Sequence, residues 1–371
     1  MKPANDPDII CRLKEIRTGK KITQTQLADL VGIKRQAIYD LETGRYLPNT
    51  AIALRLARSL NCRVEDIFCE KSQENHPIVL VDPGEIDSRV SIAKIRNTLY
   101  AYSLSSTHSI MEEMRAADGL LEPGNKRVTL LKSNEEIENT ALLLGCDPAF
   151  SILGHHVQKS RIDAALHCRF ASSEKSLRQL AASQAHIAGI HMHTSGSIDG
   201  NTEFVRSSLK NFKGLLVAFS TFEEGVMVAR GNPLDIRNPS DLAQKKVRFV
   251  NREKGAALRE LLDDCLVRLN IPFCAVNGYH ETVGTHSQGA QKIIHNICDA
   301  ALGLPAVATA FNLDFISFAQ VRCDLVIPKD LLNHTGVRMA LDTLQMKAFR
   351  KDLNGLPGYD TACSGKIMAR F

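Results

Sequence analysis

One short segment carries residue types that suit the recognition of nucleic acid. Its polar residues are Lys34, Arg35, Gln36, Tyr39, Asp40 and Arg45. In the major groove, glutamine can bind adenine through two hydrogen bonds, and arginine can bind guanine in the same way. The apolar residues at 37, 38 and 41 fall on the opposite face of one helix. We therefore expect a helix that packs on one side and offers hydrogen-bonding groups on the other.

A second group of residues is suited to holding a small anion. These residues follow short apolar runs at predicted strand-to-helix turns, where free backbone N–H groups attract negative charge. They are Asp147, Ser172, Ser173, Arg252, Lys254, Gly255, Arg259, Thr285, His286 and Ser287. Taken singly, each turn also fits an ordinary helix cap, so the ligand site depends on their joint placement in one fold.

The sequence offers little support for metal binding or catalysis. His155-His156 and His191-Met192-His193 place histidines close together, but no cysteine or carboxylate pattern completes a metal site. Cys146 has no Cys/His constellation around it in the sequence, and there is no phosphate-binding P-loop. We expect no metal, no cofactor, no catalytic residue and no enzymatic activity.

The elements that must position the basic segment are short helices. Thr23 is a candidate N-cap with Gln26 at the capping-box position, and Gly32 can end the helix that follows. A second helix is expected to begin near Lys34 and to end at Gly44. Further helices are expected over residues 9–18, 50–60 and 64–68, which makes five around one small core.

This region resembles the lambda-repressor/Cro-like helix-turn-helix family, often called Xre, over residues 9–70. The resemblance runs from Thr23-Gln24 through residues 38–45 to Pro48, and continues in residues 53–60 and 64–68. It implies a DNA-binding domain in which Lys34, Arg35, Gln36 and Asp40 face base edges. Gln24 and Arg45 would lie near phosphates, and Tyr39 shares the exposed face. It also implies a dimer on a two-half-site operator of double-stranded DNA.

The rest of the chain predicts a different class of structure. Residues 71–77 are polar and aperiodic, as in a linker, and residues 78–132 alternate as in a small, mostly β connector. From residue 138 to 371, apolar strands alternate with amphipathic helices, which favours an α/β domain of two lobes with parallel sheets. Residues 215–219 and 225–229 are predicted as two adjacent strands, and 313–317 and 324–328 as two more.

Residues 138–371 resemble type II periplasmic binding proteins. More narrowly, they resemble the molybdate-binding-protein-related domain fused behind helix-turn-helix regulators. The residues that carry the resemblance are 145–149, 189–191, 231–233, 248–253, 324–328 and 358–361. It implies a ligand cleft, with Ser173 at a ligand-serine position, and an oxyanion such as molybdate or tungstate as the ligand. The family's usual Gly-Ser-Gly-Thr-Arg is here Gly255-Ala256-Ala257-Leu258-Arg259, without the hydroxyls, so another anion or a larger molecule stays open.

Composition bounds these interpretations. A length of 371 residues indicates more than one domain. The formal net charge of +5 fits a protein that contacts DNA over one limited face, and it is too small to indicate nonspecific coating of nucleic acid. Its ten cysteines are scattered without a C-x-x-C, the N-terminus lacks a signal peptide, and no apolar run reaches membrane-spanning length. We expect a multidomain cytoplasmic regulator that forms a homodimer. The alternatives are an organic effector and a C-terminal domain that serves only as an oligomerisation scaffold.

Overall fold

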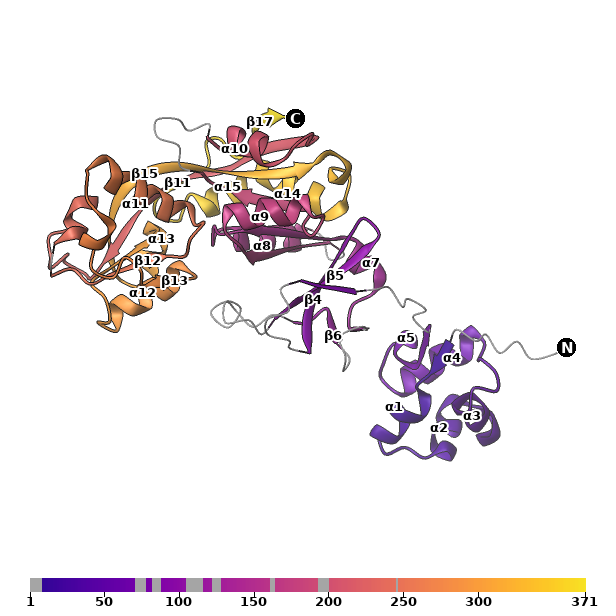
Figure 1. Ribbon diagram of the computed structural model, residues 1–371. Coiled ribbons are helices and arrows are strands. Elements are labelled where there is room, and N and C mark those ends of the chain that lie inside the picture. Colours follow the sequence, from indigo (N-terminus) through magenta and orange to yellow (C-terminus); the bar gives the residue numbers. More distant parts are fainter. Residues whose placement is uncertain are drawn as a thin grey trace. The chain divides into compact units, whose positions relative to one another are not determined.

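The structure is a computed structural model, and it describes residues 9–70, 78–81, 88–104, 116–121, 128–160, 164–192, 200–244 and 246–371. The chain forms two compact units, Met1–His76 and Pro77–Phe371. Figure 1 shows the elements of each unit. His193 lies outside the described residues, as does the whole expected linker, 71–77.

The N-terminal unit contains the five expected helices. They are α1 (Leu13–Gly19), α2 (Gln24–Val31), α3 (Arg35–Glu42), α4 (Thr50–Ser59) and α5 (Val64–Ile67). Thr23 caps α2 in a capping box with Gln26, and Gly32 ends the helix at φ +73°, both as predicted. The apolar faces of these helices enclose one core that includes Leu27, Ile38 and Leu56.

One expectation for this unit is wrong. Residues 9–11 were predicted as the start of a helix but form β1 (Ile9–Cys11), which pairs antiparallel with β2 (Phe68–Glu70). The partner strand lies nearly sixty residues later, so local periodicity could not indicate the pairing. The two strands join the beginning of the unit to its end.

An ion pair ties the helices of this unit together. Arg17 Nε lies 2.5 Å from Glu42 Oε1, and both side chains are largely buried. Glu42 also accepts a hydrogen bond of 2.8 Å from Gln24, and Arg17 donates to the carbonyl of Ile22. Since the groups come from α1, α2 and α3, the network fixes the helix that carries the polar face.

The connector is a five-stranded sheet with one short helix. Its strands are β3 (Ile78–Val81), β4 (Arg89–Ile95), β5 (Thr98–Ser103), β6 (Gly119–Leu121) and β7 (Val128–Leu130), in the order β3-β5-β4-β6-β7. Helix α7 (Asn134–Glu138) follows. One face of the sheet packs with Ile137 of α7, and the other packs on the next part of the chain through Ala93, Ile95 and Tyr102.

The remainder has two lobes built on one ten-stranded sheet. The first lobe contains β8 (Thr140–Gly145), α8 (Phe150–Ser160), β9 (Ala165–Phe170), α9 (Ser173–Ala181), β10 (Ile187–Ile190), α10 (Gly200–Ser208), α14 (Thr335–Gln345), α15 (Lys347–Leu353) and β17 (Ile367–Arg370). The second contains β12 (Phe249–Arg252), α11 (Ala257–Arg268), β13 (Thr282–Val283), α12 (His286–Ile294), β14 (Ala300–Gly303) and α13 (Pro305–Ala310). Figure 1 shows the two groups of elements side by side.

Two long strands cross both lobes, and here the sequence prediction is wrong. The four predicted strands are two continuous ones, β11 (Gly214–Val228) and β15 (Asp314–Pro328), which pair antiparallel along their length. Buried polar residues such as Ser220, Glu224 and Asp324 interrupt the apolar pattern of these strands. Each long strand was therefore predicted as two shorter strands. The pair makes the sheet mixed rather than parallel. β16 (Tyr359–Asp360) also pairs with β11.

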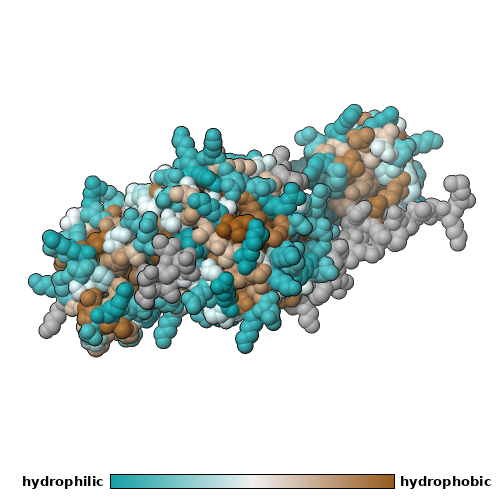
Figure 2. All heavy atoms as spheres, turned by 90° about the horizontal axis from the view of Figure 1, so that it is seen from above, coloured by the Kyte–Doolittle hydropathy of each residue, from teal (hydrophilic) through white to brown (hydrophobic). Residues whose placement is uncertain are grey.

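The surface and the thiols of the chain are ordinary for a folded protein. On the face in Figure 2, hydrophilic side chains separate smaller apolar patches. All ten cysteines are free. Among the described residues, no helix combines the length and the apolar character that a membrane span needs.

Candidate functional site

The exposed face of α3 and its N-cap carry most of the residues predicted to touch DNA. Lys34, Arg35, Gln36 and Tyr39 are exposed, while Ile38 and Leu41 of the same helix are buried. Lys34 is the N-cap residue rather than the first helical residue. The basic groups therefore lie at the start of α3, the end that enters the groove in a recognition helix.

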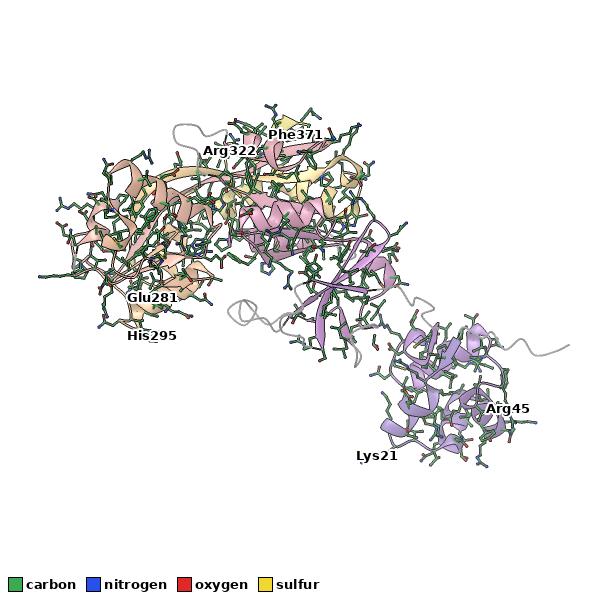
Figure 3. The ribbon with its side chains drawn as sticks, in the orientation of Figure 1. Lys21, Arg45, Glu281, His295, Arg322 and Phe371 are labelled. Atoms are coloured by element: carbon green, nitrogen blue, oxygen red, sulfur yellow. The ribbon has the colours of Figure 1, made fainter. Side chains whose placement is uncertain are left out.

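Internal bonds hold several of these side chains in place. Asp40 Oδ1 accepts 3.0 Å hydrogen bonds from both Gln36 and Arg45. The Arg45 guanidinium lies 5.4 Å from the centre of the Tyr39 ring, and Figure 3 shows Arg45 at the surface of the N-terminal unit. Gln24, predicted near a phosphate, donates to Glu42. Arg35, in contrast, is an exposed arginine at the first position of α3.

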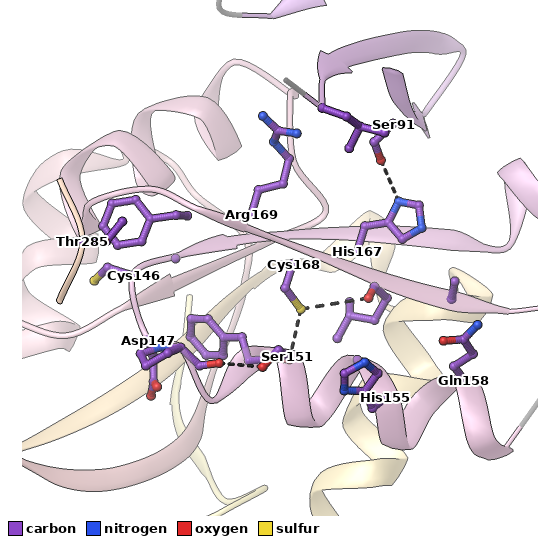
Figure 4. A pocket seen from close by; sticks show the side chains of 18 of the residues that line it. Ser91, Cys146, Asp147, Ser151, His155, Gln158, His167, Cys168, Arg169 and Thr285 are labelled. Atoms are coloured by element: carbon purple, nitrogen blue, oxygen red, sulfur yellow. Dashed lines mark hydrogen bonds between the residues drawn. The ribbon is translucent and has the colours of Figure 1, made fainter. Parts of the chain in front are cut away.

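The C-terminal unit contains a cavity of about 580 Å³. The cavity is surrounded by residues of the connector, of β8, α8 and β9 in the first lobe, and of the second lobe. Figure 4 shows most of their side chains. The lining residues are Ser91, Leu104, Ala116, Lys132, Gly145, Cys146, Asp147, Pro148, Phe150, Ser151, Gly154, His155, Gln158, Ala165, Leu166, His167, Cys168, Arg169, Phe170, Thr285, His286, Ser287 and Val307. Four of the predicted ligand residues are among them: Asp147, Thr285, His286 and Ser287.

At the end between the lobes, Asp147 is a buried carboxyl that keeps one oxygen without a partner among the described residues. Its Oδ1 accepts from the Tyr359 hydroxyl at 2.6 Å and from the Ala149 N–H at 2.9 Å, while Oδ2 has no hydrogen-bond partner. Burial raises the pKa of Asp147 to about 6, although these two donors lower it. Asp147 lines the cavity, but its unpartnered Oδ2 is itself buried, so a ligand would reach this oxygen only after a local shift of the side chain or its neighbours.

The start of α12 supplies backbone donors at the same end. Thr285 Oγ1 caps the N–H of Gln288, and the Gln288 side chain accepts from the N–H groups of Gly284 and Thr285. The N–H groups of His286 and Ser287 are first-turn donors that no carbonyl of the helix can reach. Because the helix dipole adds positive potential there, this turn can hold a negatively charged group.

Arg252 supports this turn from behind rather than lining the cavity. Its Nη1 lies 3.0 Å from His286 Nδ1, its Nη2 donates to the Gly284 carbonyl, and its guanidinium lies 5.5 Å from the centre of the Phe170 ring. Burial and the Arg252 charge lower the pKa of His286 well below its ordinary value, so the ring is neutral.

The other predicted ligand residues lie outside the cavity lining. Ser173 is buried, and its hydroxyl bonds both backbone groups of His191. Ser172 caps the N–H of Lys175, and Lys254 is exposed. Arg259 donates to the Arg252 carbonyl and stacks on Tyr279.

Gly255 marks a close approach of the two lobes beside Ser172. A Cβ built on Gly255 would lie 3.9 Å from Ser172 Oγ and 3.2 Å from Glu174 Oε2. Burial and the charge of Glu174 both raise the pKa of Glu260. The acidic Glu174 makes this place less favourable for an anion than the start of α12.

A buried polar group between the lobes was not predicted. His191 Nε2 lies 3.0 Å from Glu224 Oε1, and Cys146 Sγ lies 3.6 Å from His191 Nδ1. Burial by itself would lower the pKa of His191, but Cys146 and Glu224 raise it well above its ordinary value. The ring is therefore charged and pairs with Glu224. Among the described residues, no three His, Cys, Asp or Glu side chains are arranged to hold a metal ion.

At the connector end, the cavity is lined by Ser91, Lys132, His167 and Arg169, none of which was predicted. One signal in the sequence could have indicated two of them. In the predicted strand 164–170, His167 and Arg169 are two residues apart and so share a face. Ser91 and Lys132 gave no such signal, because the connector was not expected to meet the ligand.

Two family models match the chain. A model described as helix-turn-helix matches residues 13–67, and one described as a PBP superfamily domain matches residues 154–345. These matches confirm the helix-turn-helix resemblance, the resemblance to periplasmic binding proteins at the level of the PBP superfamily, and the fold class: a helical DNA-binding domain with a two-lobed α/β domain behind it. They are a regulator family and a binding-protein family, not enzyme families.

Individual proteins are also similar to parts of this chain. YvgK of Bacillus subtilis (strain 168) is 26% identical over 227 residues, 61% of this chain and 73% of that protein. An HTH-type transcriptional regulator of Archaeoglobus fulgidus is 41% identical over 63 residues, 17% of this chain and 89% of that protein. The crystal structure of Peb3 from Campylobacter jejuni has a TM-score of 0.42 at 14% identity, covering 59% of this chain and 99% of that one.

The raised pKa of Asp147 predicts a pH dependence of stability. The folded state binds this proton more tightly than the unfolded state, whose pKa is about 3.8, so stability is lost as pH rises between the two values. For a folded pKa of about 6, the carboxyl contributes about 2 kcal/mol more at pH 4.5 than at pH 7.5. Asp147→Asn keeps an acceptor oxygen for Tyr359 and should remove this contribution. Urea unfolding of the C-terminal unit at the two pH values measures it, and an equal pH dependence in both proteins would contradict the assignment.

Proposed function

Since the chain belongs to the PBP superfamily and carries a helix-turn-helix regulator domain before the PBP-like part, we propose that it is a one-component transcription regulator whose cavity binds a small anionic effector. The single observation that carries the proposal is the cavity itself. It joins Asp147, the start of α12 and the connector in one space, so one ligand can touch both lobes. Binding there would favour one arrangement of the lobes over another.

The volume of the cavity bears on the class of effector. A single water occupies about 30 Å³, so a tetrahedral oxyanion such as molybdate or tungstate would leave most of about 580 Å³ to solvent. Pockets for organic ligands span about 300–1,000 Å³. We therefore favour an organic acid as the effector. The oxyanion is the second candidate, because the first-turn N–H groups of α12 suit it.

DNA binding is assigned to α3. The exposed Lys34, Arg35 and Gln36 would contact base edges. Arg45 would contact the phosphate backbone of the DNA after its hydrogen bond to Asp40 is broken. Helix-turn-helix domains bind paired half-sites as dimers, so we propose a homodimer acting where the operator is, in the cytoplasm.

Arg35→Ala tests the assignment of α3. If Arg35 contacts a base, the substitution weakens operator binding by about 1–3 kcal/mol and relaxes specificity at one position. Arg58→Ala, at an exposed position of α4, is the matched control and should keep the wild-type affinity. The measurement is fluorescence anisotropy on an operator selected from random DNA. Equal affinity and an unchanged footprint in Arg35→Ala would remove Arg35 from the recognition set.

A thermal-shift titration tests the effector site. The panel contains molybdate, tungstate, sulfate and phosphate beside organic acids such as citrate, phenylacetate and glycerol phosphate. A ligand at 100 times its dissociation constant stabilises the native state by about 2.7 kcal/mol. Organic acids should give the larger shift, and Ser151→Trp, which places a large ring in the cavity wall, should abolish it. A selective shift with molybdate or tungstate would favour the oxyanion instead. The absence of any shift would favour a scaffold without a ligand.

A further inference from the structure

Two neighbouring strands end at a cysteine and a histidine that contact each other. Cys146 directly follows β8 and His191 directly follows β10, and these two strands pair in parallel. The carboxyl ends of parallel neighbours lie at the same edge of a sheet. This edge therefore brings together two residues that are 45 positions apart in the sequence, with Cys146 Sγ 3.6 Å from His191 Nδ1.

The imidazole of His191 is held from several sides. Its Nε2 lies 3.0 Å from Glu224 Oε1, in an ion pair whose side chains are 5% and 1% exposed. The ring packs edge-on against Phe222, with the ring centres 5.3 Å apart. The Ser173 hydroxyl bonds the N–H and the carbonyl of His191, so the backbone is held as well. The contact between the imidazole and the thiol is thus a fixed feature of this site.

The order of the three side chains is that of an activated nucleophile: a thiol, a base beside it, and a carboxylate that orients the base. Apart from its ion pair with His191, Glu224 has no hydrogen-bond partner for either oxygen among the described residues. A buried carboxylate of this kind needs a cation, which the imidazolium supplies. An imidazolium in contact with a thiol favours the thiolate, which is the nucleophilic form of cysteine.

Other charged groups near Cys146 act in both directions. Burial lowers the pKa of the Arg252 guanidinium, and the negative charge of Cys146 acts against that lowering, so this arginine in turn favours the thiolate. Asp147 and Glu224 have the opposite sign. Glu224 is compensated by His191, and Asp147 accepts two hydrogen bonds. The direct contact with the imidazole is therefore reinforced by Arg252, and the opposing carboxyl groups are partly offset.

Cys146 is the member of this group that a ligand can reach. It is 7% exposed and lines the cavity of about 580 Å³, whereas His191 and Glu224 are not among the lining residues. Figure 4 shows Cys146 among the side chains of the cavity wall. Phe150 and Phe170 line the same cavity, and aromatic walls of this kind suit a ligand with a carbon skeleton. The sulfur therefore faces a space in which a carbon electrophile can lie.

We propose that Cys146 is a nucleophilic thiol that forms a covalent bond with an α,β-unsaturated carbonyl compound held in the cavity. His191 is its acid–base partner, and Glu224 positions His191. The thiolate sulfur bonds the β-carbon, the π electron pair moves to the α-carbon, and that carbon takes a proton from the His191 imidazolium. The thiol thus adds across the double bond, without a leaving group or an oxidant. This goes beyond the proposed function, because reversible binding of an effector forms no bond to the protein.

N-Ethylmaleimide is a small probe of this chemical class, and the full chain contains a matched control for it. Cys168 lines the same cavity and is 8% exposed, but its Sγ donates to the Phe150 carbonyl at 3.1 Å, which retains the proton on sulfur. Cys274 is exposed and serves as a reference for the reagent. Samples quenched over time at pH 7 are digested, and mass spectrometry gives the rate of addition at each cysteine.

The wild type should add the probe faster at Cys146 than at Cys168. An ordinary thiol, with a pKa of about 8.5, is about 3% ionised at pH 7, so full ionisation raises its rate by at most about thirtyfold, and we expect a ratio of about tenfold.

Two substitutions test the partners of the thiol. His191→Gln removes the imidazole and should slow addition at Cys146 about tenfold, back to the rate of an ordinary thiol. Glu224→Gln keeps the shape of the side chain and removes its charge, and it should slow the same reaction by a smaller factor. Neither should change the rates at Cys168 and Cys274. A cavity wall loosened by the substitution would change the rate at Cys168 as well.

Two results would overturn the proposal. One is an equal rate of addition at Cys146 and Cys168 in the wild type. The other is fast addition at Cys146 that persists in both variants, since access alone would then explain the reaction. Neither result bears on the thermal-shift titration, because citrate, phenylacetate and glycerol phosphate carry no electrophilic double bond.

Discussion

The antiparallel pair of β11 and β15 is the constraint on which the C-terminal unit depends. Each strand runs through both lobes, so the lobes share one sheet and cannot separate without breaking it. The register shifts between Ala218 and Ser220 and between Glu224 and Gly225, where bulges add twist and bend a strand. The second of these shifts lies at Glu224, which pairs with the buried His191.

This arrangement explains why the cavity draws on distant parts of the sequence. The shared sheet brings the turn after β8 close to the start of α12, and the connector packs on the first lobe through the apolar cluster of Ile95, Tyr102 and Leu142. A ligand in the cavity can thus be coupled to the connector by direct contact as well as through movement of the lobes. Either route would couple ligand binding to the connector through a free energy. Such a coupling is reciprocal, so each site changes the binding free energy at the other by the same amount.

The sequence predicted local structure well and long-range structure less well. The capping box at Thr23, the turn at Gly32 and the polar face of α3 depend on neighbouring residues and were recognised. The pairing of β1 with β2 and the continuity of β11 and β15 depend on partners far away in the chain. For the site, Asp147 and residues 285–287 line the cavity, whereas Ser173 satisfies backbone groups of His191 instead. Lys132 and Ser91 also line the cavity and could not be predicted, because their place in its wall depends on how the connector packs.

The most direct test of this account is the operator affinity of the full chain with the cavity empty and with it filled. Fluorescence anisotropy would be measured with and without a saturating amount of the anion that most stabilises the protein. Coupling free energies between sites are about 1–3 kcal/mol, so we predict that the operator dissociation constant changes by about 5- to 150-fold. The change should disappear in Ser151→Trp. An operator affinity that stays the same when the cavity is saturated would contradict the regulatory role of the PBP-like domain.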